Sequence, residues 1–207
     1  MTEKIRIAVL VSGGGTNLQA LIDAQAAGQI PDGEIALVIS NKSGVYALER
    51  AEKAGIPHAT VTKKANGGTQ EGFEQALLAV LKEHNIDLIV LAGFLAILSA
   101  DFTRAYNDRI INVHPSLIPS FCGKGFYGLK VHEAALEYGV KVTGATVHLV
   151  NEIPDGGRIL LQKAVDILPD DTAETLQKRV MEQAEWKLLP QAAQLGAHQL
   201  LEEKNNV

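Results

Sequence analysis

Short apolar runs alternate with helical patterns through the first half of the chain. Ile5–Val11 is rich in β-branched residues, stops at a glycine turn and is followed by helical spacing over 17–22. Three more such pairs follow, at 34–40 with 45–54, 58–61 with 71–84, and 87–91 with 100–106. Alternating strands and helices predict a parallel sheet with right-handed crossover connections.

The pattern changes after Arg109. Residues 110–113 predict one more buried strand. In the segments 144–150 and 159–165 apolar and polar residues alternate more, and a turn with Pro-Asp-Gly-Gly at 154–157 joins the two segments. This pattern favours an antiparallel addition to the sheet. Helical spacing over 172–195 predicts a closing helix, and 202–207 a polar tail. We therefore expect one α/β domain over 1–207: a Rossmann-like, mostly parallel sheet with an antiparallel C-terminal addition and helices on both faces.

Composition narrows the classes of function. The 207 residues carry a net charge of −5 with a pI near 5.7, which argues against broad nucleic-acid binding because such proteins carry a basic footprint. The lone Cys122 excludes an internal disulfide framework. The first residues lack a secretory signal, and no apolar run approaches the roughly 20 residues that a membrane helix needs. A cytoplasmic protein is expected.

The turn Ser12-Gly13-Gly14-Gly15-Thr16-Asn17 lies between a predicted strand and helix. Glycines let the backbone approach a ligand closely, and the free N–H groups of a helix start favour a phosphate. The turn lacks a P-loop lysine, and the third glycine of a dinucleotide fingerprint would fall at Leu18. A monophosphate site is preferred; the alternative is a tight turn in which Thr16 or Asn17 caps the helix.

Asn112-Val113-His114-Pro115-Ser116 follows where a buried strand ends, at the edge where open α/β sheets bind ligands. Asn112 and His114 alternate onto one face, and prolines beyond them restrict the backbone. A carboxamide and an imidazole at a fixed separation suit the stabilisation of an oxyanion and the movement of a proton, as in acyl transfer. The alternative is that His114 is a satisfied buried residue and Asn112 caps a turn.

Asp155 lies in the Asp-Gly-Gly segment, which by itself indicates only a hairpin. Next to His114, its carboxylate would raise the pKa of the imidazole or relay protons through water. His148, on a predicted strand, is equally compatible with support of this site and with a place in the core. The six histidines and one cysteine show no metal-ligand spacing, so no metal is expected, and Cys122 lacks an activating context.

Six segments together resemble the phosphoribosylglycinamide formyltransferases, a branch of the folate-dependent formyltransferase superfamily: SGGGTNLQA, SNK, LAGFLAILS, INVHPSLIPSF, HLVNEIPDGG and the terminal helix. The resemblance spans nearly the whole chain. It implies direct transfer of a formyl group from 10-formyltetrahydrofolate to the amine of phosphoribosylglycinamide, without a metal or a covalent enzyme adduct. Catalysis would fall to Asn112, His114 and Asp155, with Asp155 holding His114 protonated.

The resemblance also implies two sets of binding residues. Those for the ribonucleotide are Gly15, Thr16, Asn17, Pro115 and Glu185. Those for folate are Gln70, Leu95, Ala96, Ile97, Leu98, Asn112 and Asn151. Gln70 and Ala96 depart from the family, where many members carry a basic residue. The glycine-rich loop 122–129 suggests a mobile flap.

Three other functions share parts of this pattern. A hydrolase of 10-formyltetrahydrofolate is expected to carry an extra amino-terminal domain, and an aminoacyl-tRNA formylase a basic carboxy-terminal one. A non-catalytic phosphate-binding module is disfavoured because all three catalytic positions match the superfamily. The sequence leaves the oligomeric state open, a homodimer included.

Overall fold

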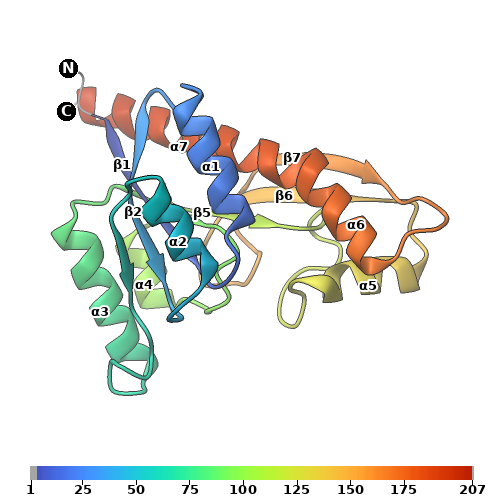
Figure 1. Ribbon diagram of the computed structural model, residues 1–207, viewed down its shortest axis with the longest axis horizontal. Helices are drawn as coiled ribbons and strands as arrows, with labels where there is room; N and C mark the ends of the chain where they lie inside the picture. Colours follow the sequence, from blue (N-terminus) through green and yellow to red (C-terminus); the bar gives the residue numbers. More distant parts are fainter. Residues whose placement is uncertain (1–3, 207) are drawn as a thin grey trace.

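Seven strands form one mixed sheet in the computed structural model, which describes residues 4–206 (Figure 1). The strand order is β3-β2-β1-β4-β5-β6-β7. The strands are β1 (Ile5–Val11), β2 (Gly33–Ser40), β3 (His58–Thr60), β4 (Leu88–Leu91), β5 (Ile110–His114), β6 (Val142–Leu149) and β7 (Ile159–Asp166). The helices are α1 (Thr16–Ala26), α2 (Tyr46–Lys53), α3 (Gln70–Glu83), α4 (Ala100–Ala105), α5 (Leu129–Tyr138), α6 (Ala173–Val180) and α7 (Trp186–Asn205).

The sheet is parallel from β3 to β5, while β6 pairs antiparallel with both β5 and β7. This confirms the predicted α/β sheet with its antiparallel C-terminal addition. The chain moves outward in one direction from β1 to β3 and then returns to place β4 on the other side of β1. Such a switch point leaves a crevice at the carboxyl ends of β1 and β4, where this fold class binds ligands.

Helices cover both faces of the sheet, as expected (Figure 1). One core cluster joins side chains of the sheet to α1, α2, α6 and α7, and the other joins the opposite face to α3 and α4. The strands β1 and β4 are buried along almost their whole length because both of their faces are covered. A strand fixed on both faces is a rigid support for the loops that leave its end.

The C-terminal region is helical for longer than predicted. In place of one helix over 172–195, α6 runs into a π-helical turn, Met181–Glu185, and then into α7, which continues to Asn205. The segment 202–205 is therefore helix and not a tail; Val207 lies outside the described residues. A π-helical turn accommodates one extra residue and often occurs at functional sites, and this one brings Glu185 to the cavity described below.

Helix α5 is an element that the sequence did not predict, because only a glycine-rich loop is expected before it. The helix buries Val131, His132 and Ala135, and Gly139 ends it in the left-handed conformation at φ 81°. The pattern Val-His-Glu-Ala-Ala-Leu-Glu-Tyr-Gly did contain this signal: a narrow buried stripe followed by a glycine C-cap. Among residues 4–206, no helix is long and apolar enough to cross a bilayer.

Candidate active site

Three chain segments meet around a cavity of about 750 Å³ at the switch point. They are the glycine turn after β1, the loop after β4 and the end of β5. The loop 123–128 and the helical segment that carries Glu185 also line the cavity. The cavity is lined by Asn17, 93–97, 112–115, 123–128, Pro154, Asp155, Gln177, Met181 and Glu185. All three predicted catalytic residues therefore lie on one wall, as does Pro115.

Asn112 is held by a histidine of the neighbouring strand. Asn112 Nδ2 lies 3.1 Å from His148 Nε2, and His148 Nδ1 lies 2.8 Å from the carbonyl oxygen of Leu149. A carbonyl can only accept, so Nδ1 donates to it, and with this proton on Nδ1 the Nε2 atom can accept from the Asn112 amide. This fixes the direction of the carboxamide and leaves its second N–H for the cavity. His148 therefore supports the site, a role that the sequence had left open.

His114 has a different partner at each ring nitrogen and is only 4% exposed. Nε2 donates to the carbonyl oxygen of Phe121 at 2.9 Å. Nδ1 lies 3.5 Å from Asp155 Oδ2, an electrostatic contact longer than a hydrogen bond. Nδ1 is therefore the nitrogen at which a proton arrives or leaves.

Burial lowers the pKa of His114 below its ordinary value and outweighs the Asp155 carboxylate and the Phe121 carbonyl, which both act to raise it. The net direction is opposite to the sequence expectation, in which Asp155 holds the ring protonated. That expectation considered the carboxylate and not the cost of burying an imidazolium. In the free protein the neutral ring is favoured, and Nδ1 is available as a proton acceptor.

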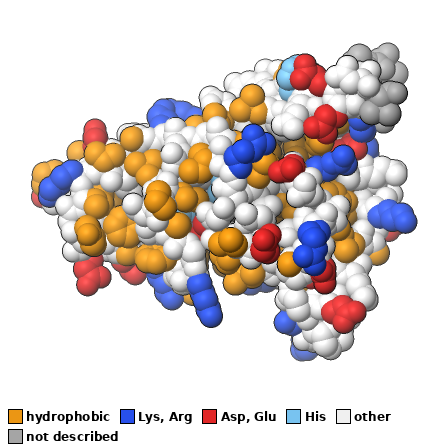
Figure 2. All heavy atoms as spheres, turned by 180° about the vertical axis from the view of Figure 1, so that it is seen from behind, with side chains coloured by type: hydrophobic (Ala, Val, Ile, Leu, Met, Phe, Trp, Pro, Cys, Tyr) orange, Lys and Arg blue, Asp and Glu red, His pale blue; other side chains and the backbone are white. Residues whose placement is uncertain are grey.

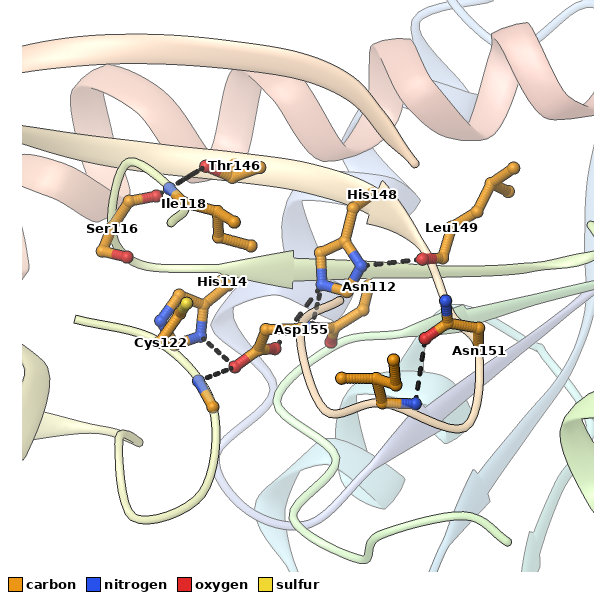
Figure 3. A network of polar contacts seen from close by, with 12 residues as sticks. Asn112, His114, Ser116, Ile118, Cys122, Thr146, His148, Leu149, Asn151 and Asp155 are labelled. Atoms are coloured by element: carbon orange, nitrogen blue, oxygen red, sulfur yellow. Dashed lines mark hydrogen bonds and ion pairs between the residues drawn. The ribbon is translucent and has the colours of Figure 1, made fainter. Parts of the chain in front are cut away.

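Asp155 lies between the two imidazoles (Figure 3). Its Oδ2 accepts the N–H of Gly123 at 2.8 Å, and its Oδ1 lies 3.5 Å from His148 Nε2. Burial pushes the pKa of Asp155 upward, but the contacts with His148, His114 and the Gly123 amide outweigh it and leave the pKa below its usual value. The carboxylate is therefore ionised at neutral pH and faces His114 as a fixed negative charge.

The glycines after Asp155 let its loop close against the end of β6. A Cβ on Gly157 would lie 1.8 Å from the carbonyl oxygen of Leu149, and one on Gly156 would lie 2.6 Å from Ile153 Cγ2. Asp155 itself has φ 56°, a left-handed conformation that aspartate tolerates better than most residues. The segment is thus both a tight connection between β6 and β7 and the support of a charged side chain.

The glycine turn has the geometry expected of an anion site. Gly15 is the N-cap of α1 at φ 74°, and no side chain caps the helix, so neither Thr16 nor Asn17 acts as the cap that the alternative interpretation required. The first N–H groups of α1 have no acceptor one turn earlier. A Cβ on Gly15 would lie 2.7 Å from Ala47 Cβ, which explains why glycine is needed there.

Glu185 meets the same end of α1. Asn17 Nδ2 donates to Glu185 Oε2 at 2.8 Å, and both side chains line the cavity. Burial raises the pKa of Glu185, and the Asn17 hydrogen bond opposes this effect. Thr16 instead lines a separate cavity of about 480 Å³ beside α1, so only part of the predicted ribonucleotide set reaches the central cavity.

The predicted folate residues divide between two cavities. Leu95, Ala96 and Ile97 line the central cavity, and a smaller one of about 120 Å³ adjoins it at Asn112 and Asp155. The smaller cavity is lined by Leu91, Phe94, 96–98, Asn112, His148, 150–152, Pro154 and Asp155, a set that includes Leu98 and Asn151.

Gln70 lines neither cavity. Its Nε2 donates to the carbonyl oxygen of Ile97 at 2.9 Å and to Glu74 Oε1 at 2.7 Å. Glu74 in turn accepts the N–H and the hydroxyl of Ser99. The amide of Gln70 thus supports the loop after β4 from behind and does not point into the site.

The loop 121–128 takes part more directly than the sequence indicated. Its Phe121 carbonyl and Gly123 amide contact His114 and Asp155, so the start of the loop is tied to both. Burial, and after it the charge of Asp155, raises the pKa of Cys122, which leaves the thiol protonated. Among the described residues, no group of three histidine, cysteine, aspartate or glutamate side chains is arranged to hold a metal.

Comparison with known proteins agrees with this geometry. The family described as formyl transferase matches residues 5–193. This chain belongs to the formyl transferase family. A phosphoribosylglycinamide formyltransferase of Haemophilus influenzae is 44% identical over 185 residues, which cover 89% of this chain and 84% of that protein.

A trifunctional purine biosynthetic protein adenosine-3 of Gallus gallus is 47% identical over 196 residues; the match covers 95% of this chain but only 19% of that protein. The crystal structure of glycinamide ribonucleotide transformylase 1 from Symbiobacterium toebii superposes with a TM-score of 0.87 at 41% identity, covering 94% of this chain and 88% of that one. The fold is thus that of other formyltransferases.

Proposed function

We propose that this protein transfers the formyl group of 10-formyltetrahydrofolate to the amine of phosphoribosylglycinamide. The observation that carries the proposal is the convergence of Asn112, His114 and Asp155 on one wall of the cavity between the glycine turn and the loop after β4. The names of the relatives in Haemophilus influenzae and Symbiobacterium toebii support the choice of substrates.

The chemistry assigns one task to each side chain. The amine nitrogen attacks the formyl carbon, a new C–N bond forms, and the former carbonyl oxygen becomes an oxyanion that accepts the second N–H of Asn112. His114 Nδ1 takes the proton that the amine loses, and the facing carboxylate of Asp155 stabilises the resulting imidazolium. The same proton passes to the folate nitrogen as its bond to carbon breaks, so the enzyme ends unchanged.

The binding residues would divide between the two substrates. Gly15, Thr16 and Asn17 would hold the phosphate at the start of α1, with Glu185 on the ribose hydroxyls and Pro115 beside them. The smaller cavity would take the pterin ring against Leu98 and Asn151. Gln70 would act on folate only through the Ile97 carbonyl that it holds.

The test is an absorbance assay with 10-formyl-dideazafolate and phosphoribosylglycinamide, run with and without the amine acceptor. We expect product only when the acceptor is present, because without it no amine nitrogen attacks the formyl carbon. Hydrolysis would require His114 to activate water in place of the amine. Product formed at the same rate without acceptor would replace the proposal by the hydrolase alternative.

We further propose that two copies associate through the edge strand β7. Figure 2 shows apolar side chains gathered over the half of the molecule that contains α5, β6 and β7. The exposed large apolar residues of these elements include Tyr138, Val142 and Ile159, and Leu168 follows β7. An open edge with apolar neighbours favours strand pairing.

In sedimentation velocity we expect a dimer for the wild type and a monomer for Ile159→Lys, with Leu195→Lys on α7 as the control. A monomeric wild type would contradict it.

Two further points complete the proposal. One formyltransferase domain over 1–207 is supported by the single sheet that runs from β1 to β7 and by α7, which packs back against it. A cytoplasmic location is supported by the single cysteine, which provides no internal disulfide of the kind common in secreted domains.

A further inference from the structure

A cation lies directly behind the glycine turn, on a helix that the proposed function does not use. Arg50 of α2 donates from Nε to the carbonyl oxygen of Gly14 at 2.8 Å and from Nη1 to Gln19 Oε1 at 2.9 Å. Its guanidinium carbon lies 4.8 Å from the centre of the Tyr46 ring. Arg50 thus joins α2, the turn and the first turn of α1 through one planar group.

The contact with Gly14 affects the direction of the peptide groups in the turn. The carbonyl of Gly13 accepts the N–H of Ala47 at 3.2 Å, so two successive carbonyls of the turn point toward α2. With these oxygens directed away, the N–H groups at the start of α1 face an anion without a competing negative dipole. Carbonyl oxygens directed toward the phosphate would repel it.

Arg50 also supplies charge where the turn has none of its own. The turn contains no lysine or arginine, and Arg50 is the cation among the described residues that line the 480 Å³ cavity beside Thr16. The group that carries this charge is a planar guanidinium. Stacking on Tyr46 and the hydrogen bond to Gln19 hold it in one position, so little side-chain entropy is lost when a ligand binds.

We propose that Arg50 is a positioning residue for the phosphate of the ribonucleotide: from behind the turn it orients the peptide groups and adds a positive charge to a turn that has none of its own. This inference rests on the proposed function. It assigns the phosphate affinity to two helices, α1 through its amides and α2 through Arg50.

The test compares Arg50→Met with Lys53→Met by steady-state kinetics. Both substitutions remove one positive charge from α2. Lys53 is a matched control because its Nζ also lies over the Tyr46 ring, 5.2 Å from the ring centre, whereas the hydrogen bond to the turn comes from Arg50. We expect Arg50→Met to raise the KM for the ribonucleotide about tenfold or more, with kcat and the KM for folate within about twofold of the wild type. Lys53→Met should leave all three unchanged.

Two further measurements separate the orientation of the turn from the positive charge of residue 50 and from general damage to the enzyme. Arg50→Lys keeps the charge but not the planar fork, and we expect it to recover part of the lost affinity; a KM as high as that of Arg50→Met would overturn the charge contribution. Glycinamide riboside, which lacks the phosphate, should be used equally poorly by the wild type and Arg50→Met.

An unchanged ribonucleotide KM in Arg50→Met, or an equal rise in both KM values, would overturn the inference. Absence of formyl transfer by the wild type would instead overturn the proposed function, so the two failures are distinguishable.

Discussion

Asp155→Asn is expected to lower turnover by roughly 10²- to 10⁴-fold while the fold is retained. The amide oxygen can still accept the Gly123 N–H that Oδ2 accepts now, so the loop keeps its anchor. The negative charge that stabilises the His114 imidazolium is lost. His114→Ala should have an effect of similar size because it removes the proton acceptor itself. Measurement of kcat at saturating concentrations of both substrates, combined with thermal denaturation, tests both variants.

The control for this pair is Asp170→Asn, an exposed aspartate in the turn after β7. It removes the same charge away from the imidazoles and should leave kcat unchanged. A titration by NMR adds an independent readout: the Asp155 carboxylate acts to raise the pKa of His114, so this pKa should fall further in Asp155→Asn. Near-normal turnover in both His114→Ala and Asp155→Asn would refute the assigned roles.

Gly15→Val is expected to weaken ribonucleotide binding by roughly 10- to 100-fold, the equivalent of about one charge-assisted hydrogen bond. The valine would have to adopt φ 74° with a branched Cβ, and this Cβ would lie 2.7 Å from Ala47 Cβ. Relief of that overlap moves the start of α1 and its N–H groups. Calorimetric titration with each substrate separately measures the effect, and folate affinity should stay within about twofold of the wild type.

A matched control exists in the same helix region. Gly28, which follows α1, has φ 72°, and a Cβ there meets nothing within 4 Å. Gly28→Val therefore introduces the same backbone strain without the clash and at the far end of α1. Both variants should unfold at a lower temperature, but only Gly15→Val should lose the ribonucleotide. Equal weakening of both substrates by Gly15→Val would count against a phosphate site at this turn.

Strong local patterns made most of the fold predictable. The apolar runs of β1 and β4 are long enough to exclude a solvent-facing strand, and the glycine turn marks where β1 ends. Asn112 and His114 could be placed together because both lie on one short strand. The assignment of Asp155 to the site depended on the family resemblance, since an Asp-Gly-Gly segment is more often only a turn.

The missing parts depend on contacts distant in sequence. One partner of the Gln70 amide is the carbonyl of Ile97, 27 positions away, and the sequence around Gln70 does not show this contact. The pKa of His114 depends on its burial, which only the packed structure sets. The π-helical turn has no distinct sequence signal, because Met-Glu-Gln-Ala-Glu fits an ordinary α-helix equally well.

One hydroxyl connects the two halves of the site. Ser12 Oγ donates to Asn41 Oδ1 at 2.7 Å and accepts the N–H of Leu95 at 2.8 Å, so the glycine turn and the loop after β4 share it. A shift of the turn would therefore reach Leu95 on the wall of the central cavity. Thermodynamic linkage then requires reciprocity: whatever factor the ribonucleotide adds to folate affinity through Ser12, folate adds to ribonucleotide affinity.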